Sequence, residues 1–146
     1  MRRAAQLAMS CLVTAACTGG AAGPVAIAVG ADLCASCRMA VVSQNTAAEI
    51  VAPGDEPLIF DEVGCLRDYL ARAPLAGDAV AYVADHRTGA WVDARVAVYT
   101  RTTASTPMGS GLLAHADGAS RDADPATRAG APVPADAILR PVRRMP

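Results

Sequence analysis

Residues 58–74 read LIFDEVGCLRDYLARAP and contain the clearest secondary-structure signals in the chain. The apolar run 58–60 predicts a short strand, and Asp61 directly after it is a favourable N-cap for a helix. Pro74 ends that predicted helix after Ala73. Apolar residues recur within it at helical spacing, and they are Val63, Leu66 and Leu70. A strand that leads directly into a short helix is the unit from which we predict the fold.

Short apolar runs on both sides of this unit predict further strands. Residues 25–29 predict a first strand, and residues 40–43 and 47–52 predict a hairpin around a polar turn. After the helix, the predicted strands are residues 80–83, 91–94, 96–99 and 112–116. The second and third of these also fit one continuous bulged strand over 91–99. Residues 117–136 predict at most one weak helix. We therefore expect an α+β fold of small antiparallel-strand modules, each with a short helix, and two similar ββαβ-like modules as one arrangement.

The composition of the chain restricts its size and its partners. A length of 146 residues suits one domain or two small modules. The 13 basic residues, all of them arginine, nearly balance the 14 acidic ones. This balance argues against a non-specific nucleic-acid binder. Aromatic residues make up only 3% of the chain, yet it contains five cysteines and five methionines, so sulfur is the feature that requires an explanation.

The first 31 residues are typical of an export signal followed by a tether. Two arginines precede the apolar stretch 4–16, which is too short for a transmembrane helix. The run Leu-Val-Thr-Ala-Ala-Cys at 12–17 resembles a bacterial lipobox, with Thr14 where leucine is preferred, and ordinary cleavage near residue 16 is the alternative. The predicted segments are a signal peptide over 1–16, a flexible tether over 17–31 that begins at lipidated Cys17, a metal-binding domain over 32–117 and a weakly ordered segment over 118–146.

Cys34-Ala35-Ser36-Cys37 is a C-x-x-C pair, whose two sulfurs a turn brings toward one point. Haem attachment would need a histidine where Arg38 stands. Structural zinc needs four ligands, and only Cys65, His86 and His115 could complete the set. A thioredoxin-like redox pair expects a helix after the motif, whereas β-prone residues follow it here. A structural disulfide is a further alternative in an exported protein.

A soft-metal site is the last alternative for this sulfur. Met39 follows the pair directly, and thiolates and thioethers select Cu(I), which accepts two or three ligands. Cys65 lies in the first turn of the predicted helix, where the helix dipole lowers the pKa of a thiol. Met108 lies in a polar loop without periodic apolar partners, and His115 follows it on a predicted strand. Burial in the core is the ordinary explanation for any one of these residues.

Five segments occur in an order that identifies a family. They are Cys34-x-x-Cys37-x-Met39, FDEVGCL at 60–66, Tyr-Val-x-Asp at 82–85, WVDA at 91–94 and TPMGSGLLA at 106–114. This set, within residues 32–117, resembles the NosL family of copper-binding lipoproteins that accompany nitrous oxide reductase. The family usually has glycine where Arg38 stands, and a non-glycine residue with positive φ there would be strained.

The resemblance implies a carrier of Cu(I) that is not an enzyme. Such a protein would be lipid-anchored to a membrane of the cell envelope, facing the periplasm or the extracytoplasmic space, and would not bind nucleic acid. It would deliver copper to a receiving protein or to the maturation complex of nitrous oxide reductase. The expected metal ligands are Met108, Cys65, Cys34, Cys37, Met39 and His115. A C-x-x-C thiol–disulfide oxidoreductase and a structural lipoprotein stapled by a disulfide are the alternative functions.

Overall fold

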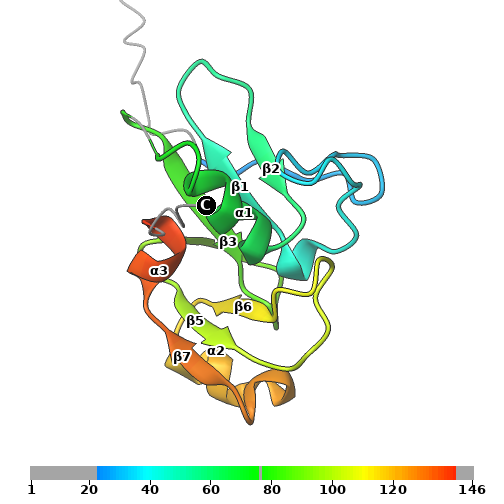
Figure 1. Cartoon of the computed structure of the whole chain (residues 1–146), viewed down its shortest axis with the longest axis vertical. Coiled ribbons are helices and arrows are strands. Elements are labelled where there is room, and N and C mark those ends of the chain that lie inside the picture. The colour runs from blue at the N-terminus through cyan, green and yellow to red at the C-terminus, as the bar shows by residue number, and fades with distance from the viewer. Residues whose placement is uncertain (1–22, 76, 141–146) are drawn as a thin grey trace, which may run out of the picture.

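Two antiparallel sheets form the framework of the protein (Figure 1). The structure is a computed structural model and describes residues 23–75 and 77–140. The first sheet has the order β2-β1-β3-β4, with strands β1 (Ala48–Val51), β2 (Leu58–Phe60), β3 (Val80–Ala84) and β4 (Trp91–Asp93). The second has the order β6-β5-β7, with strands β5 (Val98–Arg101), β6 (Leu112–His115) and β7 (Ala131–Val133). The predicted signal peptide and Cys17 lie outside the described residues.

The two sheets are built in the same way. In each, the first strand is central and pairs antiparallel with the next strand and with the strand that follows the helix. Helix α1 (Val63–Leu70) separates β2 from β3, and helix α2 (Gly118–Ala123) separates β6 from β7. The predicted α+β class is therefore confirmed, with its antiparallel strands in two similar ββαβ-like modules. Strand β4 extends the first of them.

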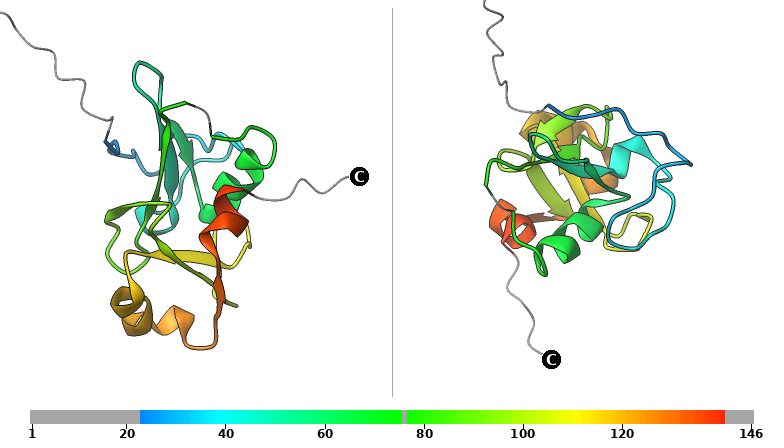
Figure 2. Two further views of the ribbon diagram at one scale, coloured as in Figure 1. Left: turned by 90° about the vertical axis from the view of Figure 1, so that its left-hand side faces the viewer. Right: turned by 90° about the horizontal axis from the view of Figure 1, so that it is seen from above.

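One core joins the two modules. Helix α3 (Ala135–Leu139) comes from the second module and contacts α1 of the first, as Figure 2 shows. Helix α1 also contacts β6. The fully buried large apolar side chains of this shared core include Phe60, Leu66, Tyr99, Leu112 and Ile138. Burying a side chain of this size contributes about 1.5–3 kcal/mol, and these residues come from both modules.

The chain before β1 forms loops instead of the predicted first strand. Residues 25–29 contain no strand, but Val25 is fixed in place. Its N–H donates to Glu49 Oε1 at 2.9 Å, and its carbonyl accepts from Trp91 Nε1 at 3.2 Å. The chain is thus attached to the first sheet from Val25 onward, within the stretch 17–31 that the sequence predicts as a tether.

The predicted hairpin of residues 40–43 and 47–52 is wrong. Strand β1 pairs with β2 and β3, and the short 3₁₀ helix η1 (Gln44–Thr46) precedes it. The Val42 N–H donates instead to Asp61 Oδ1 at 2.8 Å. The Asp61 side chain is therefore engaged by this loop, and Glu62 becomes the N-cap of α1 without a side-chain cap hydrogen bond.

Two differences also occur after α1. Residues 91–99 are not one bulged strand, because β4 and β5 belong to different sheets. Beyond residue 117 the chain is more regular than the sequence predicts: α2, the 3₁₀ helix η2 (Pro125–Thr127), β7 and α3 follow one another, and β7 completes the second sheet. None of the helices in the described part of the chain is long and apolar enough to span a bilayer.

Candidate metal centre

Three cysteines from two parts of the chain meet beside the first sheet. Cys34 and Cys37 lie in the loop before β1, and Cys65 lies in the first turn of α1. Their Sγ atoms all lie within 4.8 Å of one another, and all three are free thiols. Cys34 and Cys65 are buried, whereas Cys37 is half-buried. The structure therefore brings the predicted cysteines into one cluster that could hold a metal ion.

Backbone hydrogen bonds fold residues 34–38 into a single helical turn. The Arg38 N–H donates to the Cys34 carbonyl at 2.9 Å, and Arg38 has a φ of 66°. Glycine usually ends a helical turn in this left-handed conformation, so Arg38 is strained where the NosL-like pattern has glycine. The Cys34 N–H donates to the Met39 carbonyl at 2.8 Å, which closes the loop. The turn thus points both of its sulfurs toward α1.

A polar loop lies across the first turn of α1, where Cys65 is located. The Met108 N–H donates to Glu62 Oε2 at 3.1 Å. A Cβ atom at Gly64 would lie 2.5 Å from the Cβ of Ser110. Because real Cβ atoms do not approach so closely, only glycine at position 64 lets this loop pack against the helix. The loop that contains Met108 is thereby held next to the helical turn that contains Cys65.

Both candidate methionines lie at the surface. The Met39 side chain is 56% exposed, although the Met39 backbone closes the C-x-x-C turn. The Met108 side chain is 46% exposed on its loop above α1. Core packing, the ordinary explanation for a methionine, therefore applies to neither. Each thioether is exposed on a segment that also positions one of the clustered cysteines.

Burial, neighbouring thiols and backbone hydrogen bonds shift the pKa values of Cys34 and Cys65 in opposite directions. Burial raises the pKa of Cys65, and its neighbours Cys34 and Cys37 raise it further. The expectation that the helix dipole favours a Cys65 thiolate is therefore wrong, because desolvation and nearby sulfur outweigh the dipole. Burial also acts to raise the pKa of Cys34, but backbone hydrogen bonds from Cys37, Asp61 and Ser36 outweigh it and lower that pKa. Cys34 therefore ionises more readily than Cys65.

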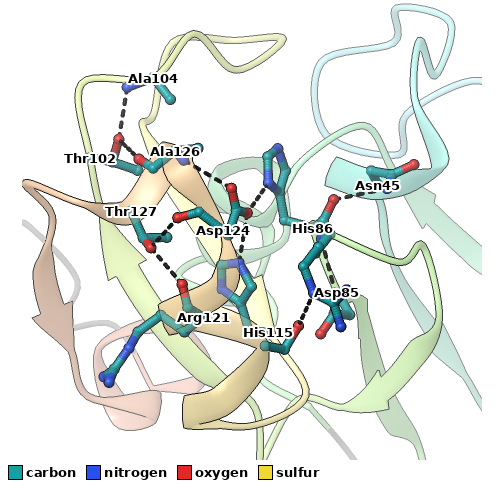
Figure 3. A network of polar contacts seen from close by, with 12 residues as sticks. Asn45, Asp85, His86, Thr102, Ala104, His115, Arg121, Asp124, Ala126 and Thr127 are labelled. Carbon is teal, nitrogen blue, oxygen red and sulfur yellow. Dashed lines mark hydrogen bonds and ion pairs between the residues drawn. The ribbon is translucent and has the colours of Figure 1, made fainter.

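The structure places His115 in a different group from the cysteines. Its Nε2 atom lies 2.9 Å from Asp124 Oδ2, and His86 Nδ1 lies 2.6 Å from the same oxygen (Figure 3). The ligand atoms of these three residues all lie within 4.8 Å of one another. The sequence suggests His86 only as a zinc ligand beside the cysteines, and it contains no signal for Asp124. This residue precedes Pro125 in a stretch without clear periodicity, so only the fold reveals it.

Comparisons with protein-family models, with curated proteins and with solved structures find no match to this chain. The fold and the site therefore define the class of the protein. It is a small α+β protein of two similar modules, with a three-cysteine cluster that could bind a metal ion.

Proposed function

We propose that the cluster of Cys34, Cys37 and Cys65 binds Cu(I) and that the protein is a copper carrier of the cell envelope. The observation that supports this proposal is the convergence of three thiol sulfurs within 4.8 Å, with thioethers exposed nearby. Sulfur ligands select soft ions, and Cu(I) is the soft ion that accepts two or three of them. The NosL-like order of motifs supports the same metal and suggests nitrous oxide reductase maturation as the destination.

The dimensions of the cluster suit one ion. Metal–thiolate bonds of about 2.3 Å place three sulfurs roughly 4 Å apart around a trigonal ion. Separations of up to 4.8 Å therefore need shifts of less than about 1 Å. Cys34 and Cys37 share one turn, and the Cys37 side chain is half-buried, so it is the least enclosed of the three.

Ligand exchange is the mechanism that this arrangement favours. Cu(I) would first meet the half-buried Cys37 and then Cys34, whose pKa is lowered, and Cys65 would lose its proton when the ion binds. The raised pKa of Cys65 makes this sulfur the one that protonation most easily releases. Exposed Met39 and Met108 would offer weaker thioether ligands on the path to a partner. A three-coordinate ion leaves room for an incoming sulfur or imidazole before the first ligand departs.

The burial of Cys34 argues against the alternative of a thiol–disulfide oxidoreductase. The attacking thiol of such an enzyme must be both ionised and accessible. Cys34 has the lowered pKa, yet its side chain is fully buried. The more accessible Cys37 would have to attack instead. Metal binding needs no access of a bulky disulfide to Cys34.

Competition with a chromogenic Cu(I) chelator under reducing conditions tests the proposal. We expect the wild-type protein to retain one Cu(I) in the sulfur cluster and Cys65→Ser to lose most of it. Met108→Leu should retain copper less well than Met145→Leu, a matched control outside the motifs. Unchanged retention in Met108→Leu would remove Met108 from the site, and no retention by wild type would overturn the proposal.

Two further assays separate the alternative functions. An oxidoreductase would catalyse insulin reduction and lose that activity in Cys34→Ser, whereas a copper carrier shows no turnover. A disulfide-stapled structural protein would unfold on reduction, and added Cu(I) would not protect it. Transfer of the bound copper to the purified, copper-free maturation complex of nitrous oxide reductase would support the proposed destination.

A further inference from the structure

We propose that His86, His115 and Asp124 form a second metal site, which takes a borderline divalent ion such as Zn(II). The two imidazole nitrogens converge on one carboxylate oxygen, as Figure 3 shows. These residues come from three elements: His86 from the turn between β3 and β4, His115 from the end of β6, and Asp124 from the junction of α2 and η2. This site shares no residue with the sulfur cluster and does not depend on copper binding there.

The fold positions each donor independently of the others. The His86 N–H donates to the Ala114 carbonyl at 2.8 Å, and the His86 carbonyl accepts from Asn45 Nδ2 at 2.8 Å. The second oxygen of Asp124, Oδ1, accepts from the Ala126 N–H at 2.9 Å. His115 is fixed by its place in β6, opposite Val98 of β5. The three donors are therefore held together by backbone contacts even without their mutual hydrogen bonds.

The hydrogen bonds among His86, His115 and Asp124 leave one buried ring nitrogen of His115 unpaired. A carboxylate accepts, so both histidines must donate to Asp124 Oδ2, which uses one nitrogen of each ring. The other nitrogen of His115, Nδ1, has no hydrogen-bond partner, although the side chain is fully buried. An unpaired buried polar atom costs about 1–3 kcal/mol. Zinc at Nε2 would not pair this nitrogen, so the support for a metal site is the convergence of three ligand atoms from His86, His115 and Asp124 within 4.8 Å of one another.

The chemistry of the donors differs from that of the sulfur cluster. Two imidazole nitrogens and one carboxylate oxygen are the usual ligands of Zn(II) and similar ions, with a water in the remaining position. Ligands at about 2.0–2.2 Å from one ion stand roughly 3.3 Å apart in tetrahedral geometry. From separations of 2.6 and 2.9 Å, the donors need to move by less than about 1 Å.

The charge and the exposure of the site also suit a divalent cation. Asp124 contributes a carboxylate group, which can offset part of the ion's charge. The His86 side chain is 26% exposed, while His115 is fully buried. An ion can therefore approach from the His86 side, and water can complete its coordination there.

Binding at this site would connect the two modules. His86 lies in the turn between β3 and β4 of the first sheet, whereas His115 and Asp124 belong to the second module. Nearby, the Ala116 N–H donates to Asp85 Oδ2 at 2.8 Å, so the same turn already contacts the end of β6. An ion held from both sides stabilises the folded state, and the gain grows with the logarithm of the free ion concentration once that concentration exceeds Kd.

Histidine-ring ¹⁵N NMR on the tag-free protein, titrated with ZnCl₂ in the presence of reductant, tests this site. The chain contains only two histidines, so their ring signals report on this group and not on the cysteines. We expect His86 Nδ1 and His115 Nε2 to shift together and to saturate with a stoichiometry of one ion. Unchanged ring signals in the presence of several equivalents of zinc would overturn the proposal.

Two variants distinguish ligation from a structural role. Asp124→Asn should weaken zinc binding at the histidines at least tenfold, and Asp122→Asn, an exposed position on the same helix, should leave it unchanged. If Asp124→Asn does not fold, His86→Gln replaces it, because that side chain is partly exposed and its amide can still donate to Asp124. Zinc binding with wild-type affinity by either variant would refute the assignment.

Discussion

Glu49 provides a quantitative test of how the first sheet is held together. It lies on β1 between Ile59 of β2 and Tyr82 of β3, and its side chain is fully buried. One carboxyl oxygen accepts from the Val25 N–H, and the other has no hydrogen-bond partner. Burial raises the pKa of Glu49 from its ordinary 4.5 to about 7, against the smaller opposite effect of the Val25 hydrogen bond. The folded protein therefore keeps Glu49 protonated at pH values where the unfolded chain has lost that proton.

The consequence is a loss of stability as the pH rises. Below pH 4.5 both states bind the proton, and Glu49 costs nothing through ionisation. Between pH 4.5 and about 7 the folded state binds more protons than the unfolded state, so the free energy of unfolding falls. At about 1.36 kcal/mol per pH unit, the loss reaches about 3 kcal/mol above pH 7. Glu49→Gln removes this ionisation.

Urea unfolding at pH 5, 6, 7 and 8 measures the effect through the fluorescence of Trp91, the only tryptophan. We expect Glu49→Gln to gain stability relative to wild type as the pH rises, by about 1–3 kcal/mol at pH 8. Glu56→Gln, at an exposed position, is the matched control and should follow wild type at every pH. A difference between Glu49→Gln and wild type that does not change with pH would refute the reasoning.

Three further predictions concern the backbone and the core. Arg38→Gly should raise the free energy of unfolding by up to about 1 kcal/mol in urea titrations, because relief of the left-handed strain exceeds the added chain entropy; a loss of stability would contradict this. Gly111→Ala should lower the thermal midpoint markedly, because φ is +63° and the new Cβ would collide with the Thr102 carbonyl oxygen; an unchanged midpoint by calorimetry would disprove that collision. Phe60→Ala should cost about 3–5 kcal/mol, since Phe60 is fully buried with its ring centroid 5.3 Å from that of Tyr69; a cost below 1 kcal/mol by circular dichroism would exclude a central place in the core.

Local signals were sufficient where neighbouring residues determine the structure. The strand at 58–60 and the helix after it follow from apolar spacing, and the structure contains both as β2 and α1. The hairpin at 40–52 failed because the donors of that loop find partners far along the chain, such as Asp61 for Val42. A single sequence contains no local information about such a pairing.

The candidate site was likewise predictable from the sequence only in part. The C-x-x-C spacing predicts that Cys34 and Cys37 meet, and the fold adds Cys65 to them. The ionisation of Cys65 was predicted in the wrong direction, because the helix position is visible in the sequence whereas the burial is not. Asp124 could not be found, because its role depends on two histidines that approach it from two modules.

X-ray absorption spectroscopy at the copper edge tests the central claim most directly. The sample is reduced protein loaded with one equivalent of Cu(I), compared with the Cys65→Ser variant. The proposal predicts a first shell of sulfur with two to three ligands in wild type and one sulfur fewer in the variant. A first shell dominated by nitrogen or oxygen, or a sulfur shell that Cys65→Ser leaves intact, would contradict the assignment of Cu(I) to Cys34, Cys37 and Cys65.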